Sequence, residues 1–251
     1  MNILLTNDDG YDSVGIQALY EVLSKNHIVK VCAPLTQQSA TGHSINLFKA
    51  LKLNEVSSGY ALDGTPADCV KVALFGVYRE VDFDVVISGI NKGINMGCDI
   101  FYSGTVAAAR EGLINGIPGI ACSIARQATK KNYIDAALVV DKLLLDFKNK
   151  IFRKQAILNI NFPIKDKYDL LKITHLGKRT YNETIYIEEK EDGKYASIVG
   201  ECDSFLYSEG SDLNCVDEGY ISITPLSNEY FVPKLIDELV KITTEYNRSF
   251  E

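Results

Sequence analysis

The sequence predicts an α/β fold in which a mainly parallel sheet is covered by helices on both faces. The first observation is a strand, helix, strand unit made of apolar residues 3–5, an amphipathic helix at 14–23 and a β-branched strand at 28–33. The second is that strands and helices keep alternating up to about residue 165, as in parallel sheets joined by crossover helices. The third is size, because 251 residues, 46% of them hydrophobic, suffice for one such domain with an appendage.

Local patterns predict the individual elements. Residues 14–23 repeat apolar side chains at spacings of three and four, which indicates a helix with one buried face. Thr65, Pro66 and Asp68 form a helix start, with the hydroxyl as N-cap and the proline at the first position. The remaining elements of the core are expected in this order: two strands within 46–62 joined at Ser57-Ser58-Gly59, a strand at 82–88, a helix at 106–114, a strand at 118–123, a helix at 133–147 and a strand at 157–161.

The pattern changes after Pro163. Alternating residues at 184–191 and 194–199 flank Asp192-Gly193, which predicts a β-hairpin. Because an isolated hairpin is only marginally stable, we expect this one to pack on a partner subunit or on the core.

The last part of the chain carries one more strand and one more helix. A strand at 220–225 and an amphipathic helix at about 233–246 are expected to return to the core or to cross to a neighbouring subunit. We therefore interpret residues 1–165 as the core and residues 166–251 as an extension of the same structural domain.

Charge and cysteine content exclude several classes of protein. The formal net charge of −7 gives no electrostatic footprint for nucleic-acid polymers or anionic membranes. No apolar run reaches the about 18 residues that a membrane span requires, and we expect no signal segment before the first strand. The six cysteines lack paired CxxC spacing, so we expect reduced thiols in a cytoplasmic protein rather than a zinc site or a disulfide framework. They are Cys32, Cys69, Cys98, Cys122, Cys202 and Cys215.

Two adjacent carboxylates, Asp8 and Asp9, follow the first strand directly. Ligands of open α/β sheets bind beyond the carboxyl ends of the strands, so this placement indicates a functional site. Burial and like charge both raise the pKa of such carboxylates, and a divalent cation keeps both of them ionised. The alternative is that the two acids only cap the following helix, which Gly10 and Ser13 help to begin.

Two later loops are expected at the same edge of the sheet. The polar loop at 37–44 offers the candidate site residues Ser39, Thr41, His43 and Ser44, with His43 as a candidate base, although such a run is equally typical of a plain loop. The glycine-rich segment at 89–97 is predicted to form a long irregular loop. It supplies Asn91 and Asn95, whose amides suit a hard cation and phosphate oxygens, unless they only satisfy their own loop backbone.

A phosphate-binding start is predicted for the helix at 106–114. Ser103-Gly104-Thr105 combines two hydroxyls, an unobstructed glycine and the positive end of a helix, although a plain N-cap has a similar sequence. An oxygen-only ligand set indicates Mg²⁺ or Mn²⁺. A cation beside an anion-binding helix start is the arrangement that phosphoester hydrolysis needs.

The ordered motifs of the chain resemble those of the SurE (survival protein E) nucleotidases over nearly its whole length. The matching segments are Asn7-Asp8-Asp9-Gly10, the loop around Ser39, Gly64-Thr65-Pro66-Ala67-Asp68, Ser88-Gly89-Ile90-Asn91 with Gly93 and Asn95, Tyr102-Ser103-Gly104-Thr105-Val106, Gly210-Ser211-Asp212 and the segment 219–226. The resemblance implies a Rossmann-like three-layer core and a phosphatase that needs one divalent cation per subunit, Mg²⁺ or Mn²⁺. It also implies nucleoside 5′- and 3′-monophosphate substrates, activity on short polyphosphate, and a homodimer or homotetramer formed by exchanging C-terminal elements.

The resemblance also assigns roles residue by residue. Its metal ligands fall on Asp8, Asp9, Ser39 and Asn91, and its phosphate contacts on Asn95, Ser103, Gly104 and Thr105. We expect in-line attack on the phosphate by a metal-bound water, with Asp8 or Asp9 as an alternative general base. The chain departs from the family at Leu35-Thr36, where Asp-Arg is common, so substrate preference is less defined than chemistry.

Three other functions compete with this interpretation. A haloacid-dehalogenase phosphatase needs an Asp-x-Asp spacing, whereas Asp8 and Asp9 are adjacent. A dinucleotide-dependent oxidoreductase needs a glycine-rich first turn, where this chain has two carboxylates that would repel a pyrophosphate. A non-catalytic nucleotide sensor could use the same pocket, and it would bind nucleotide without turnover.

Overall fold

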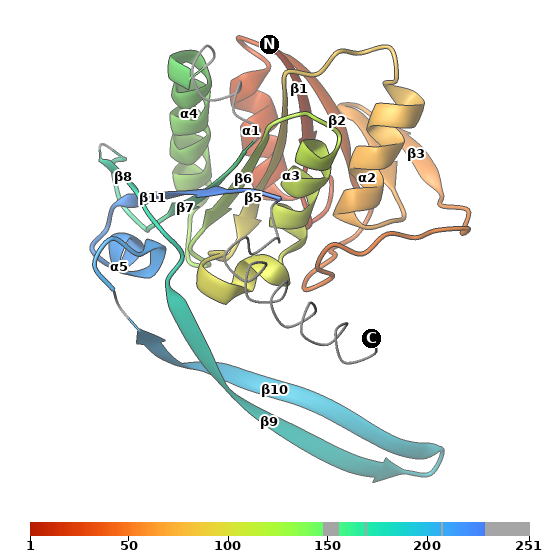
Figure 1. The fold of residues 1–251 in the computed structure, drawn as a ribbon. Helices are drawn as coiled ribbons and strands as arrows, with labels where there is room; N and C mark the ends of the chain where they lie inside the picture. Colours follow the sequence, from red (N-terminus) through yellow and green to blue (C-terminus); the bar gives the residue numbers. More distant parts are fainter. Residues whose placement is uncertain (148–155, 169, 207, 229–251) are drawn as a thin grey trace, which may run out of the picture.

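The computed structural model describes residues 1–147, 156–168, 170–206 and 208–228, and their fold is the α/β architecture that the sequence predicts. The central sheet of these residues has the strand order β3-β4-β2-β1-β5-β6-β7-β11-β8 (Figure 1). Its strands are β1 (Asn2–Thr6), β2 (Ile28–Pro34), β3 (Leu53–Val56), β4 (Gly59–Leu62), β5 (Val85–Lys92), β6 (Gly119–Ile124), β7 (Ile157–Phe162), β8 (Leu171–Ile173) and β11 (Ile221–Leu226). The five neighbours β4, β2, β1, β5 and β6 pair in parallel, as does β7 with β6.

Helices cover both faces of this sheet. They are α1 (Val14–Leu23), α2 (Pro66–Val72) with a following π-helical turn η1 (Ala73–Val77), the 3₁₀ helix η2 (Gly97–Phe101), α3 (Gly104–Ile114), α4 (Lys130–Phe147) and α5 (Asp212–Asp217). Figure 1 shows α1 and α4 on one side of the sheet and α2 and α3 on the other. None of the helices in the described part of the chain is long and apolar enough to cross a membrane.

Alternate residues of β1 pack into opposite layers. Ile3 and Leu5 belong to a core cluster with residues of α1 and α4, whereas Leu4 packs with residues of α2 and with Ala108 of α3. The side chains of Ile3, Leu4 and Leu5 are all fully buried. Because burying one such side chain stabilises the fold by about 2 kcal/mol, both layers fix the position of β1 and of the carboxylates that follow it.

The segment at 89–97 differs from its prediction as one long irregular loop. β5 continues through Lys92, with an irregularity in its pairing to β6 between Ser88 and Asn91, and η2 begins at Gly97. Ile90 is fully buried in the α1/α4 cluster, which explains why the strand continues. The glycine and asparagine residues around Ile90 have low strand propensity, so the sequence pattern did not predict that β5 extends to Lys92.

The predicted hairpin is present and forms a projecting arm. β9 (Lys178–Lys190) pairs antiparallel with β10 (Gly193–Leu206), and the arm extends away from the sheet (Figure 1). At its base, Arg179 and Tyr181 both bind Asp99 of η2. The arm therefore joins the body at the segment that leads into α3.

The C-terminal strand returns to the body. β11 lies between β7 and β8, antiparallel to the former and parallel to the latter. The sequence did not predict β8, whose three residues are all exposed, or α5. The predicted helix at 233–246 lies outside the described residues.

Candidate functional site

The candidate site lies where β1 and β5 end at the same edge of the sheet. β1 has β2 on one side and β5 on the other, both parallel to it, so the strand order changes direction there. Ligands of such sheets bind at this kind of switch point. Asp8 and Asp9 follow β1 directly, and Asn91 lies near the end of β5.

Asp8 is joined to the start of α3. The hydroxyl of Thr105 donates a hydrogen bond of 2.6 Å to Asp8 Oδ1. Ser103 caps the helix, with its side chain accepting from the Val106 amide at 3.1 Å. The prediction of a plain N-cap is thus correct for Ser103. The amides of Gly104 and Thr105 lack intrahelical acceptors, as in any first helical turn, and the Thr105 amide also interacts with the Asp8 carboxylate.

Gly104 makes the close approach of α3 to Asp8 possible. A Cβ at this position would lie 2.9 Å from Asp8 Cβ and 3.1 Å from Pro66 Cγ. Because non-bonded carbon atoms need about 3.5 Å, no other residue fits here without displacing its neighbours.

Asp9 and the loop after β2 complete this edge of the site. The backbone amide of Lys92 donates to Asp9 Oδ2 at 2.8 Å, which links β1 to the end of β5. The Gln38 amide donates to the Asp8 carbonyl at 2.7 Å, which ties the loop that contains Ser39 to the backbone at the end of β1. The Ser39 hydroxyl accepts from Gln37 Nε2 at 2.8 Å.

Both carboxylates are costly to ionise in this environment. The pKa of Asp8 is raised to about 6, mainly by burial, and the charge of Asp9 adds to this rise while the hydrogen bond from the Thr105 hydroxyl opposes it. Burial also raises the pKa of Asp9, against the Lys92 amide and the charges of Lys92 and Arg126. A cation bound between the two acids would reverse both shifts.

The two asparagines of the β5–η2 segment have different surroundings. Asn91 Nδ2 donates to the carbonyl of Gly93 at 2.7 Å, so this amide does satisfy its own loop backbone. Asn95 is buried and donates through Nδ2 to Ser123 Oγ at 2.8 Å. Ser123 is in turn the registered neighbour of Asn91 on β6, so the structure brings the two asparagines to one place.

His43 does not contact the carboxylates and binds Glu111 of α3 instead. The distance from His43 Nε2 to Glu111 Oε2 is 2.8 Å, and Lys71 of α2 reaches Glu111 Oε1 at 2.8 Å. Of the other polar residues in this loop, Thr41 donates to the Gln38 carbonyl, and the Ser44 carbonyl accepts from Thr65. These three residues therefore order the loop around Ser39.

Replacing Glu111 by glutamine is expected to destabilise the protein in a pH-dependent manner. Burial alone would raise the pKa of Glu111, but hydrogen bonds from His43, Lys71 and Asn115 outweigh it and leave this pKa below its ordinary value of 4.5. The carboxylate therefore stabilises the fold fully above pH 4.5, and this contribution is lost as the pH falls through the lower, folded-state pKa. We expect Glu111→Gln to reduce the free energy of unfolding by about 1–3 kcal/mol at neutral pH, and by less at about pH 3.5.

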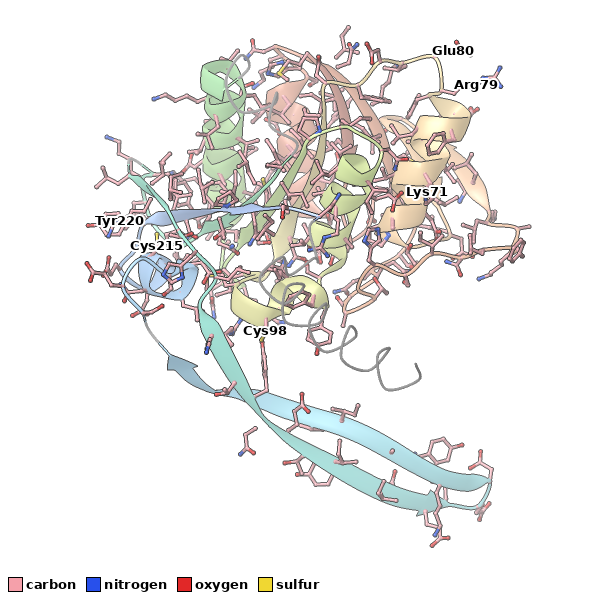
Figure 2. All side chains as sticks on the ribbon, viewed as in Figure 1. Lys71, Arg79, Glu80, Cys98, Cys215 and Tyr220 are labelled. Atoms are coloured by element: carbon pink, nitrogen blue, oxygen red, sulfur yellow. The ribbon has the colours of Figure 1, made fainter. Side chains whose placement is uncertain are left out.

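Urea unfolding at the two pH values measures this difference. Glu80→Gln is the matched control, because Glu80 pairs with Arg79 on the surface, where both side chains are more than 70% exposed (Figure 2). An exposed pair of this kind contributes little, so the control should differ from the wild type by less than about 0.5 kcal/mol. A Glu111→Gln effect that is equal at both pH values would contradict the assignment.

Sequence reasoning missed several polar residues around the site. Lys92 and Arg126 place positive charge near Asp9. Asn159 and Asn161 of β7 are fully buried and bind the backbone of Asn95. The signal that could have found the latter pair is two asparagines at alternate positions of an otherwise apolar strand.

The donor atoms at this edge fit a hard divalent cation. Asp8 and Asp9 offer carboxylate oxygens, and the predicted co-ligands Ser39 and Asn91 have neutral oxygens, the donor types that Mg²⁺ and Mn²⁺ prefer. Two buried oxygen atoms near this edge have no hydrogen-bond partner in the described structure. They are Oδ1 of Asn7, the residue before Asp8, and Oγ of Ser88, which pairs with Thr6 across β1 and β5. In the part of the chain that is described, no three His, Cys, Asp or Glu side chains form a metal-binding group.

The chain is similar to known proteins over most of its length. Residues 3–183 match the family described as Survival protein SurE. The protein named 5′-nucleotidase SurE from Petrotoga mobilis is 42% identical over 252 residues, covering 95% of this chain and 98% of that protein. The protein of the same name from Clostridium botulinum strain Loch Maree is 40% identical, covering 90% of this chain and 92% of its own length.

A solved structure agrees with the fold. The crystal structure of the SurE protein from Aquifex aeolicus superposes with a TM-score of 0.84 at 36% identity, covering 97% of this chain and all of the other. The alignment therefore extends over nearly the whole chain. With a family match across most of the chain and full-length relatives at about 40% identity, this protein belongs to the SurE family.

Proposed function

We propose that this protein is a divalent-cation-dependent 5′-nucleotidase that hydrolyses nucleoside monophosphates to nucleoside and phosphate. The observation that carries the proposal is the contact between Asp8 and Thr105, which joins a buried carboxylate pair to the start of α3. Cation binding and anion binding are thereby adjacent at one edge of the sheet. The names of the full-length relatives support the same activity.

The carboxylate side of the site binds the cation. Asp8 and Asp9 supply the negative charge, and Ser39 and Asn91 complete the oxygen set. When bound, the cation supplies Lewis acidity toward a phosphoryl oxygen and lowers the pKa of water. We assign one Mg²⁺ or Mn²⁺ to each subunit.

The helix side of the site binds the phosphate. The amides of Gly104 and Thr105 and the hydroxyl of Ser103 lie at the positive end of α3, where a phosphate dianion is stabilised. Asn95 donates one amide N–H to Ser123 and has a second for a phosphate oxygen. These donors orient the ester for in-line attack by water.

Water attack forms a phosphorus–oxygen bond and breaks the bond to the nucleoside oxygen. The proton of this water passes to solvent when a bound cation acidifies the water; alternatively, Asp8 or Asp9 accepts that proton as general base. The departing nucleoside alkoxide takes a proton from solvent. His43 has no part in this step, because its Nε2 is bound to Glu111 on the third turn of α3.

The finer assignments belong to the same proposal. We include 3′-monophosphates and short polyphosphate among the substrates, because the donors described above contact only the phosphate. We place the enzyme in the cytoplasm as a homodimer or homotetramer that assembles through the β9–β10 arm. Ile185, Ile187 and Ile198 of this arm are 53%, 66% and 75% exposed, and such side chains favour burial against another surface. A monomer in sedimentation would contradict this assembly.

Phosphate release from adenosine 5′-monophosphate tests the activity directly. We expect release with Mn²⁺ or Mg²⁺, a loss of at least about 100-fold after EDTA treatment, and recovery when the cation is restored, because the carboxylates alone cannot polarise the ester. A parallel panel of 3′-monophosphates and tripolyphosphate defines the range of substrates. Undiminished release in EDTA would contradict the cation requirement, and nucleotide binding without release would favour a sensor.

A further inference from the structure

β7 carries two buried asparagines in an otherwise apolar strand. Asn159 and Asn161 are both fully buried, and their alternate positions place them on the same face of the sheet. A buried amide destabilises a protein unless its hydrogen-bonding groups find partners. The partners of these two side chains therefore indicate their role.

Both asparagines bind the backbone of Asn95. Asn161 Oδ1 accepts from the Asn95 amide at 2.8 Å, and Asn161 Nδ2 donates to the Asn95 carbonyl at 3.0 Å. The side chain of Asn161 thus engages both backbone groups of one residue, as a neighbouring strand would. Asn159 Nδ2 donates to the same carbonyl at 2.8 Å.

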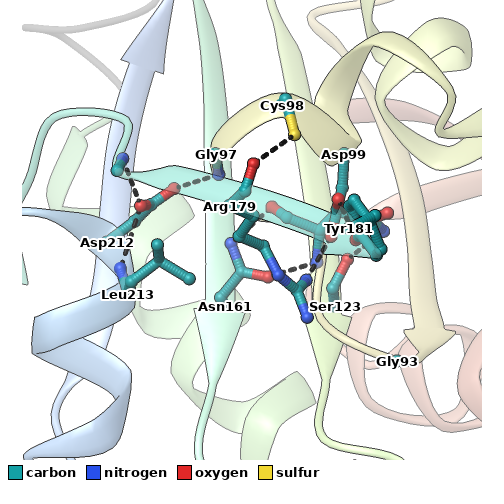
Figure 3. Close-up of polar contacts among 12 residues, drawn as sticks. Gly93, Gly97, Cys98, Asp99, Ser123, Asn161, Arg179, Tyr181, Asp212 and Leu213 are labelled. Atoms are coloured by element: carbon teal, nitrogen blue, oxygen red, sulfur yellow. Dashed lines mark hydrogen bonds and ion pairs between the residues drawn. The ribbon is translucent and has the colours of Figure 1, made fainter. Parts of the chain in front are cut away.

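The side chain of Asn95 is fixed from β6. Its Nδ2 donates to Ser123 Oγ at 2.8 Å, and Ser123 is fully buried. Ser123 and Asn161 are both labelled in Figure 3. Asn95 is therefore held by three side chains from two strands, although it lies outside any helix or strand and between Gly93 and Gly97. A segment flanked by glycines has many accessible backbone conformations, so these contacts select one of them.

We propose that Asn161, supported by Asn159 and Ser123, is the positioning residue that orients the side-chain amide of Asn95 toward the phosphate. The inference rests on the proposed function, because it assigns Asn161 to the phosphate contact of the same site. Asn161 itself does not touch the substrate and acts through the backbone of Asn95. Since an error of about 1 Å in the placement of a binding group can cost about 100-fold in rate, loss of this support should be measurable.

Steady-state kinetics of Asn161→Ala with Mn²⁺ and adenosine 5′-monophosphate tests the proposal. We expect kcat/KM to fall by about 10- to 100-fold and the inhibition constant for inorganic phosphate to rise by about tenfold or more. Mn²⁺ affinity should stay within about twofold of the wild type, because the contacts of Asn161 are to Asn95 and not to Asp8 or Asp9. This separation of phosphate from metal is not expected from general instability.

Ser222→Ala is the matched control. Ser222 is the registered neighbour of Asn161 on β11, is equally buried, and uses its hydroxyl to bind Thr174 at 2.8 Å. The control should lower the melting temperature while leaving kcat/KM and phosphate inhibition within about twofold of the wild type. An equal kinetic loss in Ser222→Ala would overturn the proposal, since a buried polar deletion near the site would then explain both results.

A double variant tests whether Asn161 acts through Asn95. If it does, the double variant Asn95→Ala/Asn161→Ala should have a phosphate inhibition constant within about twofold of that of Asn95→Ala. The reason is that the side-chain amide that Asn161 positions is already absent in Asn95→Ala. Multiplication of the two single effects would overturn the proposal. If Asn161→Ala fails to fold, Ser123→Ala is the replacement variant, because it removes only the hydrogen bond to the Asn95 side chain. Wild-type phosphate inhibition in Ser123→Ala would then overturn the proposal.

These outcomes are distinguishable from failure of the proposed function. If the wild-type protein releases no phosphate with any cation, the nucleotidase proposal fails, and with it this inference. If the wild type is active but Asn95→Ala has unchanged phosphate inhibition, the phosphate contact assigned to Asn95 and this inference both fail, while the nucleotidase activity stands.

Discussion

Replacing Asp8 by asparagine is expected to abolish phosphate release and to make the metal-free protein more stable. The carboxylate is buried beside Asp9, and its pKa of about 6 shows that its charge is unfavourable without a cation. The shift from 3.8 amounts to about 2–3 kcal/mol of destabilisation at neutral pH. Asparagine removes the charge and still offers an oxygen to the Thr105 hydroxyl, which lies 2.6 Å away.

The pH dependence of this effect follows from the direction of the shift. Because folding raises the pKa of Asp8, the wild type loses stability as the pH rises from 3.8 through about 6. In EDTA, the Asp8→Asn variant should therefore melt at a higher temperature than the wild type at pH 7 and at a similar temperature near pH 4. Excess Mn²⁺ should reverse the order, because it stabilises only a protein that binds it.

The activity of this variant should fall by at least about 1,000-fold, because the cation contributes several kcal/mol to the stabilisation of the transition state. Asp12→Asn is the matched control, since it removes the same charge from an exposed position in the same loop. We expect that control to keep wild-type activity. Full activity in Asp8→Asn would refute the assignment of the carboxylate pair.

Replacing Gly104 by alanine is expected to cause the second large loss of activity. The new Cβ would lie 2.9 Å from Asp8 Cβ, so either the first turn of α3 or the carboxylate must move. Such movement separates the phosphate-binding amides from the metal-binding acid. We expect kcat/KM to fall by about 100-fold or more, with weaker Mn²⁺ binding and weaker phosphate inhibition together.

Gly112→Ala provides a comparison within the same helix. Its Cβ would lie 2.5 Å from Val86 Cγ2 in the core, so this variant should lower the melting temperature more than Gly104→Ala does. At a temperature where both variants are folded, Gly112→Ala should retain kcat/KM within a few-fold of the wild type. Wild-type kcat/KM in Gly104→Ala would show that the close packing of α3 on Asp8 is not needed for activity.

Local signals in the sequence were sufficient for much of the fold. Thr65 and Asp68 form the capping box that starts α2, with Pro66 at the first helical position as expected. The hairpin is also confirmed, although the connecting residues are Glu191 and Asp192, and Gly193 already pairs with Lys190. In both cases the residues that specify the structure are near each other in the chain, so pattern reasoning can detect them.

The contacts that the sequence did not predict join residues that are distant in the chain. Asn161 is predictable as part of a strand, but its bonds to Asn95 exist only because β7 lies next to β6 in the folded sheet. His43 resembles a catalytic base in the sequence, and only the packing of its loop on α3 reveals Glu111 as its partner. Lys92 contacts Asp9 through its backbone amide, a contact that no residue type specifies.

The strand order of the sheet also bears on how the chain is synthesised. β11 (Ile221–Leu226) forms the antiparallel neighbour of β7 (Ile157–Phe162), although the whole arm lies between them in sequence. A nascent chain that has left the ribosome only as far as β7 presents the unpaired edge of a buried, apolar strand, which is prone to wrong pairing. Translation of the C-terminal strand is therefore the event that closes this edge, and a chain truncated before residue 221 would keep it open.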